Sequence, residues 1–295
     1  MTRQEISHAV DRLIAGAVDM HIHIGPESRL QRRQDSLQLA QAAEAAGMRA
    51  IVLKNREYGT AALARLAQGL TPKVGVIGSF TLDNEAGGLN PGAVLAWARL
   101  GAKVVWMPTA TAANSKGKVL RSRGLDLPGE GQTILDARGR LLPEVVEILR
   151  IIKEHDIVLG TGHLAPQEVF ILVTEALKAG IKKVVVTHVL QDQLMDEILT
   201  NEEIARLAEM GAFIEYSYWT CENNIHKISP NVLVDSIKRV GAAHCIMTTD
   251  FGQIDNPPAP EGFKSFIRAM LEGGIPAKDI EMMVKTNPSR LLGLD

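Results

Sequence analysis

The 295-residue sequence has few cysteines, no surplus of charge of one sign and no long hydrophobic run. Its two cysteines, Cys221 and Cys245, are too few for a disulfide framework or a structural zinc knuckle, which favours a reducing cytoplasm. The 32 basic and 34 acidic residues give a formal net charge of -2. This balance argues against a nucleic acid partner, because no excess of positive charge is available to bind a polyphosphate backbone.

The longest apolar stretches are too short and too polar to cross a membrane. Residues 181–190, for example, include two lysines and a histidine. The first ten residues carry charged side chains and no apolar core, so we do not expect a secretion signal. These absences predict a cytoplasmic protein that acts on a small molecule, without a membrane partner, and they leave a homo-oligomer open.

Short apolar, β-branched runs alternate along the chain with longer segments of helical period. Near-continuous apolar runs such as residues 183–187 are typical of strands buried on both faces, as parallel strands are. Glycines that precede several runs, such as Gly47 and Gly180, suit the left-handed residue that ends a helix. The eight runs that we expect to form strands are residues 17–24, 49–54, 73–81, 102–108, 157–160, 182–188, 212–218 and 245–249.

Eight strand–helix units in one series predict a single α/β domain over residues 1–295, a (β/α)8 TIM barrel with parallel strands. An open, doubly wound sheet fits less well, because Gly25 after the first strand is not followed by the spaced glycines of a phosphate-binding turn. Residues 109–140 lack an apolar period, which predicts an irregular loop or lid. Since they follow the fourth strand, they would lie at the carboxyl rim of the barrel, where active sites are built.

Five residues of metal-ligating types follow the predicted strands. His21 and His23 lie two residues apart at the end of the first strand, so their side chains point to one face and can bind one metal ion. Taken alone, the pair could equally be two core histidines. His163, His188 and Asp250 follow the fifth, sixth and eighth strands. The shared position at strand ends predicts a metal site at the carboxyl rim.

This order of residues resembles the amidohydrolase superfamily of metal-dependent hydrolases. Members have HxH after strand one, a histidine after strands five and six, and an aspartate after strand eight. Residues 285–294, KTNPSRLLGL, are also similar to the Asn-Pro-Ala-Arg-Leu-Leu-Gly close of many members. The resemblance implies that His21, His23 and Asp250 surround one metal, with Asp250 as the base on a metal-bound water. It implies that His163 and His188 bind a second ion or support the first.

The sequence departs from that family pattern at the fourth strand. Two-metal members usually place a carboxylated lysine or a glutamate there to bridge the ions, whereas this strand ends in Pro108 and Thr109. Lys54, at the end of the second strand, would be a bridge if it were carboxylated, since some relatives take a bridging cysteine from strand two. As an ammonium, Lys54 would instead orient an anionic substrate or reach solvent. Without a bridge the site would be mononuclear, as in the decarboxylase and deaminase branches.

Histidine nitrogens and one carboxylate, without thiolates, suit Zn²⁺, with Mn²⁺, Fe²⁺ or Ni²⁺ as rivals, as one or two ions. Such an ion lowers the pKa of its bound water towards about 7 and polarises a carbonyl or phosphoryl oxygen. Asp250 would take the proton of that water and pass it to the leaving group. With only one metal, His188 would hold the substrate oxygen.

Other side chains near the predicted rim are candidates for weaker roles. Basic side chains suit a carboxylate or phosphate, although solvated surface charge is the more common role of any one of them, and aromatic ones would form an apolar wall. Glu215 and Tyr216 alternate along the seventh strand, so only one of them faces the barrel. Asp19 either caps local backbone or orients a ligand histidine, and Cys221 is a poor candidate for a nucleophile. The proposed substrate-binding residues are Arg29, Arg56, Thr109, Lys116, Tyr218 and Trp219.

We therefore expect a metal-dependent hydrolase that cleaves an amide, lactam, lactone or ester bond of a small molecule with a metal-activated water. A mononuclear decarboxylase, hydratase or deaminase of the same superfamily is the alternative, and the number of bound ions distinguishes the two. A non-catalytic metal-binding barrel is the least favoured, because a scaffold has no need of four histidines and an aspartate at one rim.

Overall fold

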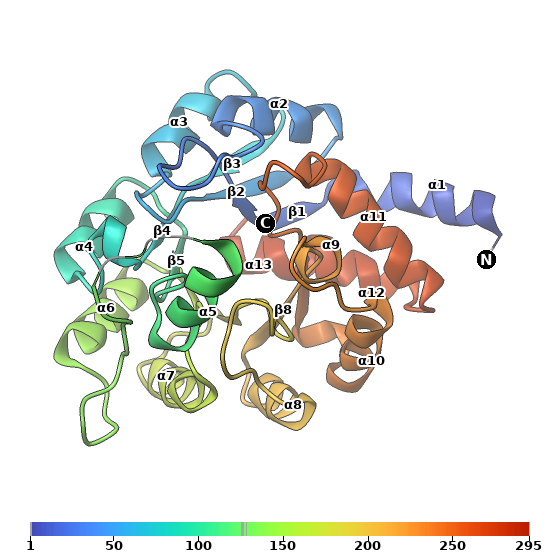
Figure 1. Ribbon diagram of the computed structural model, residues 1–295. Coiled ribbons are helices and arrows are strands. Elements are labelled where there is room, and N and C mark those ends of the chain that lie inside the picture. The colour runs from blue at the N-terminus through green and yellow to red at the C-terminus, as the bar shows by residue number, and fades with distance from the viewer. Residues whose placement is uncertain (1, 125–126, 128, 295) are drawn as a thin grey trace. The chain divides into compact units, whose positions relative to one another are not determined.

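The structure is a computed structural model that describes residues 2–124, 127 and 129–294. Strands and helices alternate along most of the described chain (Figure 1). The strands are β1 (Val18–His23), β2 (Ala50–Lys54), β3 (Gly75–Ile77), β4 (Ser79–Thr81), β5 (Val104–Trp106), β6 (Val158–Gly160), β7 (Val184–Val186), β8 (Phe213–Ser217) and β9 (Cys245–Thr248).

The longer helices begin with the residues that favour helix starts. Thr2, Asp35 and Thr200 each form a capping box with the residue three positions on, and α4, α6, α7, α10 and α11 have proline in their first turn. The helices are α1 (Arg3–Ile14), α2 (Ser36–Ala45), α3 (Ala61–Gln68), α4 (Pro91–Arg99), α5 (Ala113–Arg123), α6 (Pro143–Glu154), α7 (Pro166–Lys178), α8 (Asn201–Glu209), α9 (Trp219–Glu222), α10 (Pro230–Val240), α11 (Ala259–Glu272), α12 (Ala277–Glu281) and α13 (Asn287–Leu292). Short 3₁₀ turns span Asn84–Ala86 and Ala242–His244, and a π-helical turn spans Met282–Thr286.

The chain divides into two compact units. The first comprises Met1–Lys54, Ala62–Ile77 and Glu215–Asp295, and the second comprises Asn55–Ala61 and Gly78–Ile214. The first unit contains the parallel sheet β1-β2-β3, and the larger sheet has the order β4-β5-β6-β7-β8-β9. The pairs from β4 to β8 are also parallel, for example Ser79 with Val104 and Val186 with Ile214.

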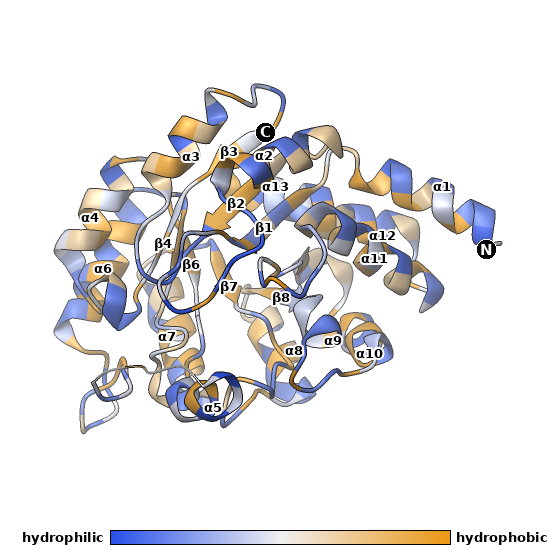
Figure 2. Ribbon diagram, turned by 45° about the horizontal axis from the view of Figure 1, so that its top comes forward, coloured by the Kyte–Doolittle hydropathy of each residue, from blue (hydrophilic) through white to orange (hydrophobic). Residues whose placement is uncertain are grey.

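The strands are buried and the helices are amphipathic, as the short apolar runs and the segments of helical period in the sequence predict. Every residue of β1 and β2 is buried. Figure 2 shows β2 in the hydrophobic colour, whereas α1 and α11 mix hydrophobic and hydrophilic residues. In the described part of the chain, no helix has the length and apolar content that a membrane span requires.

Each of the eight predicted strand regions contains a strand, but residues 73–81 form two. β3 and β4 are separated by Gly78 and pair with different neighbours, β2 and β5. A Cβ atom at Gly78 would lie 2.3 Å from the Cα atom of Ala61, so only glycine allows this close approach of two backbones.

The prediction that residues 109–140 are irregular is wrong for a third of that segment, because α5 lies within it. The buried residues of α5 are Asn114, Ser115 and Val119, of which only Val119 is apolar. A helix held by polar contacts has no apolar period for the sequence to reveal. The role of the segment as a lid stays a prediction.

A buried carboxylate fixes the start of this segment in the second unit. Asp83, which follows β4 and is fully buried, accepts hydrogen bonds from the backbone N–H groups of Thr109 and Thr111, both at 2.9 Å. The hydroxyl groups of both threonines donate to it as well. Thr109 therefore uses both its donors inside the protein, and its role in substrate binding stays a prediction.

We expect the Asp83→Ala substitution to lower the free energy of unfolding by about 3 kcal/mol, because it leaves several buried donors without an acceptor. Urea unfolding monitored by circular dichroism measures this loss. Asp196→Ala is the matched control, since the Asp196 carboxylate is exposed and pairs with the exposed Arg121; its cost should stay below about 1 kcal/mol. Equal losses of unfolding free energy in the two variants would contradict the role of Asp83 as the buried acceptor that holds Thr109 and Thr111.

Candidate metal centre

The backbone of β1 brings together residues that lie more than 220 positions apart in the sequence. The N–H of Asp250 donates to the carbonyl oxygen of His21 at 2.9 Å, and the N–H of His23 donates to that of Phe251 at 2.7 Å. The segment that follows β9 thus continues a parallel ladder along β1. This pairing places the Asp250 carboxylate beside the two histidines.

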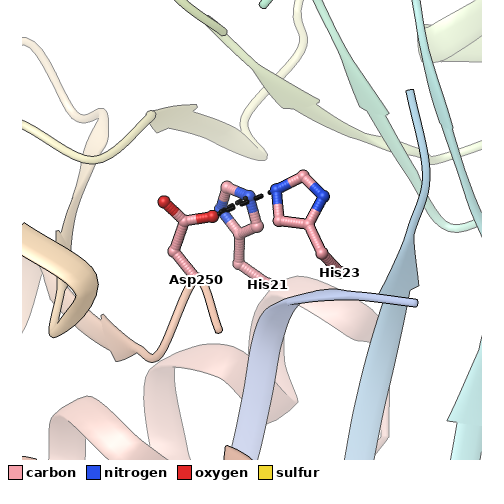
Figure 3. Close-up of side chains that lie close together, drawn as sticks. All are labelled: His21, His23 and Asp250. Atoms are coloured by element: carbon pink, nitrogen blue, oxygen red, sulfur yellow. Dashed lines mark ion pairs between the residues drawn. The ribbon is translucent and has the colours of Figure 1, made fainter. Parts of the chain in front are cut away.

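His21, His23 and Asp250 form a buried triad within the first unit. Figure 3 shows both imidazole rings reaching the same oxygen of Asp250. Oδ1 of Asp250 lies 3.2 Å from Nε2 of His21 and 3.2 Å from Nε2 of His23. One ligand atom from each of the three lies within 4.8 Å of the others. Two atoms that each lie about 2.1 Å from one tetrahedral ion are about 3.4 Å apart, so this spacing fits a shared ion.

Two neighbours fix the tautomer of His21. Its Nδ1 lies 2.7 Å from Oε1 of Glu215, and a carboxylate only accepts, so Nδ1 carries the proton. Its Nε2 lies 2.8 Å from Nζ of Lys54, and an ammonium only donates, so Nε2 presents a lone pair. Thr248 donates to the same Glu215 oxygen at 2.7 Å. The lone pair on Nε2 is the one that a metal ion requires.

Burial, and after it the neighbouring charge of Lys54, lowers the pKa of His21 to about 3. The ring is therefore neutral at pH 7, so an ion that binds Nε2 would not have to displace a proton of the ring itself.

Asp19 supports the backbone of the triad rather than a ligand ring. Its carboxylate accepts from the N–H of His21 at 3.1 Å, from the N–H of Thr249 at 3.2 Å and from the Thr249 hydroxyl at 2.6 Å. Burial raises the pKa of Asp19 to about 7. Of the two interpretations of Asp19, the structure favours the capping role.

Glu215, not Asp19, orients the ring of His21, and the sequence pattern did not identify this role. Its neighbour Tyr216 points the other way and shares a hydrogen bond of 2.9 Å with Ser236 of α10. The alternation of side chains along β8 predicted that Glu215 and Tyr216 lie on opposite faces of the strand, but it did not indicate which of them faces inward. The usable signal was charge, because a carboxylate on a buried strand requires a partner.

His23 has a different partner at Nδ1, the guanidinium of Arg32 at 3.3 Å. Arg32 also donates to Glu27, and both of these side chains are almost completely buried. A guanidinium only donates, so Nδ1 of His23 accepts and its Nε2 carries the proton towards Asp250. Ligation of an ion through Nε2 would require that proton to leave.

His163 and His188 meet within the second unit. Their Nε2 atoms are 3.0 Å apart and their rings meet edge to face, with centroids 4.6 Å apart. His188 and Asp250 both have positive φ angles, 24° and 54°. Backbone conformations of this kind are costly for residues with a side chain and are concentrated at functional sites.

The other residues that the sequence predicted to bind substrate differ in how exposed their side chains are. Arg29, Arg56 and Lys116 are half-buried. Tyr218 is buried and stacks on Phe266 of α11, with ring centroids 5.0 Å apart. Burial raises its pKa to about 12, so its hydroxyl stays protonated. The Tyr218 ring therefore packs in the core, and its role as an apolar wall for a substrate stays a prediction. Trp219, which begins α9, is 2% exposed.

Both cysteines are buried, and burial raises the pKa of each thiol to about 12. A thiol with so high a pKa supplies almost no thiolate at neutral pH. This supports the expectation that Cys221 is not a nucleophile.

Comparison with protein families gives one match. A model described as a family of unknown function, DUF6282, matches residues 16–215, which is more than half of the chain. Among curated proteins, none matches the chain.

Solved structures match over nearly the whole length. An amidohydrolase from Pseudomonas aeruginosa is 14% identical, with 96% of this chain and 98% of that chain covered and a TM-score of 0.63. The probable dipeptidase PvdM from Pseudomonas aeruginosa is 12% identical, with 99% and 98% covered and a TM-score of 0.66. A 2,6-dihydroxybenzoate decarboxylase from Rhizobium is 15% identical, with 95% and 99% covered and a TM-score of 0.52. These neighbours come from across the amidohydrolase superfamily and confirm the predicted fold, an α/β TIM barrel with parallel strands.

We expect Glu215→Gln to weaken zinc binding by about 10- to 100-fold, because an uncharged amide no longer holds the Nδ1–H of His21 as strongly. Competition with a chromophoric chelator measures the affinity. Glu222→Gln is the control, since that carboxylate pairs with the exposed Lys227 instead. Unchanged affinity in the Glu215 variant would show that this carboxylate has no part in metal binding.

Proposed function

The chain belongs to the DUF6282 family of unknown function, and we propose that it is a metal-dependent hydrolase of an amide, lactam, lactone or ester bond in a small molecule. The observation that carries the proposal is the buried triad of His21, His23 and Asp250. Three buried groups of metal-ligating type, gathered on one pair of neighbouring strand ends, have no evident role in packing. Their place at the carboxyl ends of β1 and β9 is where TIM barrels carry out catalysis.

The donor set fits a divalent ion. Two imidazole nitrogens and one carboxylate suit Zn²⁺, and Mn²⁺, Fe²⁺ and Ni²⁺ are alternatives. When bound, such an ion would make a water molecule more acidic and polarise a carbonyl or phosphoryl oxygen. His21 carries no proton on Nε2 but must release the Lys54 ammonium that is bonded to it, whereas His23 must first lose the proton on Nε2.

Asp250 is the residue that we propose as the base. Its backbone is fixed by the hydrogen bond to His21, and its carboxylate is only 7% exposed, which keeps a bound proton away from bulk water. A carboxylate in this position can accept a proton from the attacking water and deliver it to the leaving group.

His163 and His188 are proposed as a second metal-binding group, or as the group that holds the substrate oxygen if one ion is bound. Their Nε2 separation of 3.0 Å is close to that of two ligands on one ion. The absence of a bridging side chain after β5, where Thr109 is bound to Asp83, favours the mononuclear alternative. That alternative is a decarboxylase, hydratase or deaminase, and one of the structural neighbours is named as a decarboxylase.

The chemical state of Lys54 distinguishes the two-metal alternative from the mononuclear one. As an ammonium it occupies the lone pair of His21 that an ion would need. Reaction of its neutral amine with carbon dioxide would form an N–C bond and release one proton, giving a carbamate whose oxygens can bind metal. We propose this carboxylated lysine as the bridge of a two-metal site. If Lys54 stays an ammonium, it is better suited to orient an anionic substrate.

The other proposed substrate contacts are assigned only to a class of chemical group on the substrate. Arg29, Arg56 and Lys116 would bind an anionic group of the substrate, and Trp219 would pack against an apolar part. The near-zero net charge argues against a nucleic acid partner, and we propose a small-molecule substrate instead. The low cysteine content supports a cytoplasmic location.

The double variant His21→Ala/His23→Ala should lose the metal bound by the triad and at least about 100-fold in turnover, because both ligand rings are removed. Metal content is measured by mass spectrometry of the purified protein, and turnover is measured on a panel of amides, lactams, lactones and esters. His155→Ala/His226→Ala is the control that removes two histidines from outside the triad. Full metal content in the first double variant would overturn the site.

Lys54→Ala should lower the metal content and abolish the carbamate signal that ¹³C-bicarbonate gives in the NMR spectrum of the wild-type protein, if Lys54 bridges two ions. Lys73→Ala, a change at an exposed lysine, should leave both unchanged. An unchanged metal count with a raised KM for an anionic substrate would instead show that Lys54 acts as an ammonium.

A further inference from the structure

The first turn of α5 is buried and polar. Asn114 and Ser115 are buried although the helix carries four basic side chains and a glycine between residues 116 and 123. The Asn114 amide donates to the carbonyl oxygens of His163 and Leu164, both at 3.3 Å. It also exchanges two hydrogen bonds with the backbone of Glu197, at 3.0 and 2.8 Å. These contacts hold the start of α5 against the segments that follow β6 and β7.

Ser115 makes two short contacts from this fixed position. Its Oγ lies 2.7 Å from the carbonyl oxygen of Leu194 and 2.7 Å from Nδ1 of His163. A helical serine usually bonds a carbonyl of its own helix, whereas these partners lie 79 and 48 positions away. The contacts are therefore part of the tertiary structure and not a by-product of the helix.

The chemistry of the three groups fixes the direction of both hydrogen bonds. A carbonyl oxygen only accepts, so an O···O distance of 2.7 Å to Leu194 requires the Ser115 hydrogen to lie between the two oxygens. Serine has one hydrogen, and Ser115 has none left for His163. The other contact must therefore be donated by Nδ1–H of His163 to the lone pair of Ser115.

We infer that Ser115 is a positioning residue that holds His163 as the Nδ1–H tautomer, with the lone pair of Nε2 directed at His188. Ser115 thus does for His163 in the second unit what Glu215 does for His21 in the first. The tautomer follows from the hydrogen bonds alone, while its use in binding an ion rests on the function proposed above.

The same argument assigns the proton of His188. Two imidazole lone pairs 3.0 Å apart would repel each other, so with Nε2 of His163 unprotonated, Nε2 of His188 carries a hydrogen and donates it. Binding of one ion by both rings then displaces that hydrogen as a proton, either to solvent or to Nδ1 of His188. His163 is the histidine whose tautomer is set in advance, and His188 is the one that must change.

The first test reads the tautomer of the metal-free protein directly. Protein labelled with ¹⁵N in its histidines is studied by long-range ¹H–¹⁵N correlation at about pH 8, where histidines are neutral. The His163 signals are assigned from a His163→Gln spectrum. We expect His163 to be protonated at Nδ1. A proton on Nε2 of His163 in the wild-type protein would overturn the inference.

The second test uses three variants of α5. Ser115→Ala should shift His163 towards the Nε2–H tautomer and weaken Zn²⁺ binding by the histidine pair by about 10- to 100-fold. Ser115→Thr, which keeps the hydroxyl, should restore the wild-type tautomer, and Ser122→Ala, which deletes a hydroxyl elsewhere on the helix, should change neither property. An unchanged tautomer in a folded Ser115→Ala protein would contradict the role of Ser115.

The zinc measurement is made by chelator competition in the His21→Ala/His23→Ala background, so that only the second group is titrated. A shifted tautomer with unchanged zinc affinity would support the role of Ser115 and reject His163 as a ligand. Failure of the positioning inference and failure of the proposed metal site are thus distinguishable.

Discussion

The candidate centre depends on one backbone interaction, the parallel pairing of β1 with the segment that follows β9. Asp250 donates to the carbonyl oxygen of His21 and His23 donates to that of Phe251, so the two strand ends cannot shift independently. A displacement of one residue along either strand would turn the histidines or the aspartate to the opposite face. The positive φ of Asp250 shows that the chain turns sharply where its carboxylate meets the rings.

The hydrogen bonds around this pairing are important for stability because the charged groups that form them are buried. Four charged side chains around the triad are buried, those of Asp19, Glu215, Lys54 and Arg32. Removing such groups from water is costly unless each one is hydrogen-bonded. Every one of them has a partner on a strand end or on the segment after β1. The polar groups around the triad therefore form a mutually dependent set. Loss of one leaves its partner buried and unsatisfied, which is more costly than the bond itself.

Local patterns were sufficient to predict the strands and the residues at their ends, whereas the grouping of the triad came from the resemblance to a known family. Periodicity within four to nine residues located all eight strand regions, and the position of a histidine or aspartate at a strand end required only that the strand be recognised. The fold followed from the regular order of these units, because parallel strands joined by helices leave few topologies. The resemblance to solved amidohydrolase structures agrees with that inference.

What the sequence did not reveal depends on contacts between distant segments. The break at Gly78 results from the approach of Ala61, and the α5 helix depends on polar bonds to residues after β6 and β7. Glu215 and Arg32 became recognisable only when the rings of His21 and His23 were seen beside them. A partner 194 positions away from His21 leaves no spacing that a pattern could detect.

The four histidines divide into two kinds by whether Nε2 carries a hydrogen. His21 and His163 face acceptors, Glu215 and Ser115, so their Nε2 atoms present lone pairs. His23 faces the donor Arg32, and His188 faces a lone pair of His163, so both carry hydrogen on Nε2. In the second unit, the Nε2–H of His188 meets the lone pair of His163, and in the first unit the Lys54 ammonium meets the lone pair of His21. In the protein without an ion, these hydrogen bonds satisfy lone pairs that would otherwise be buried without a donor.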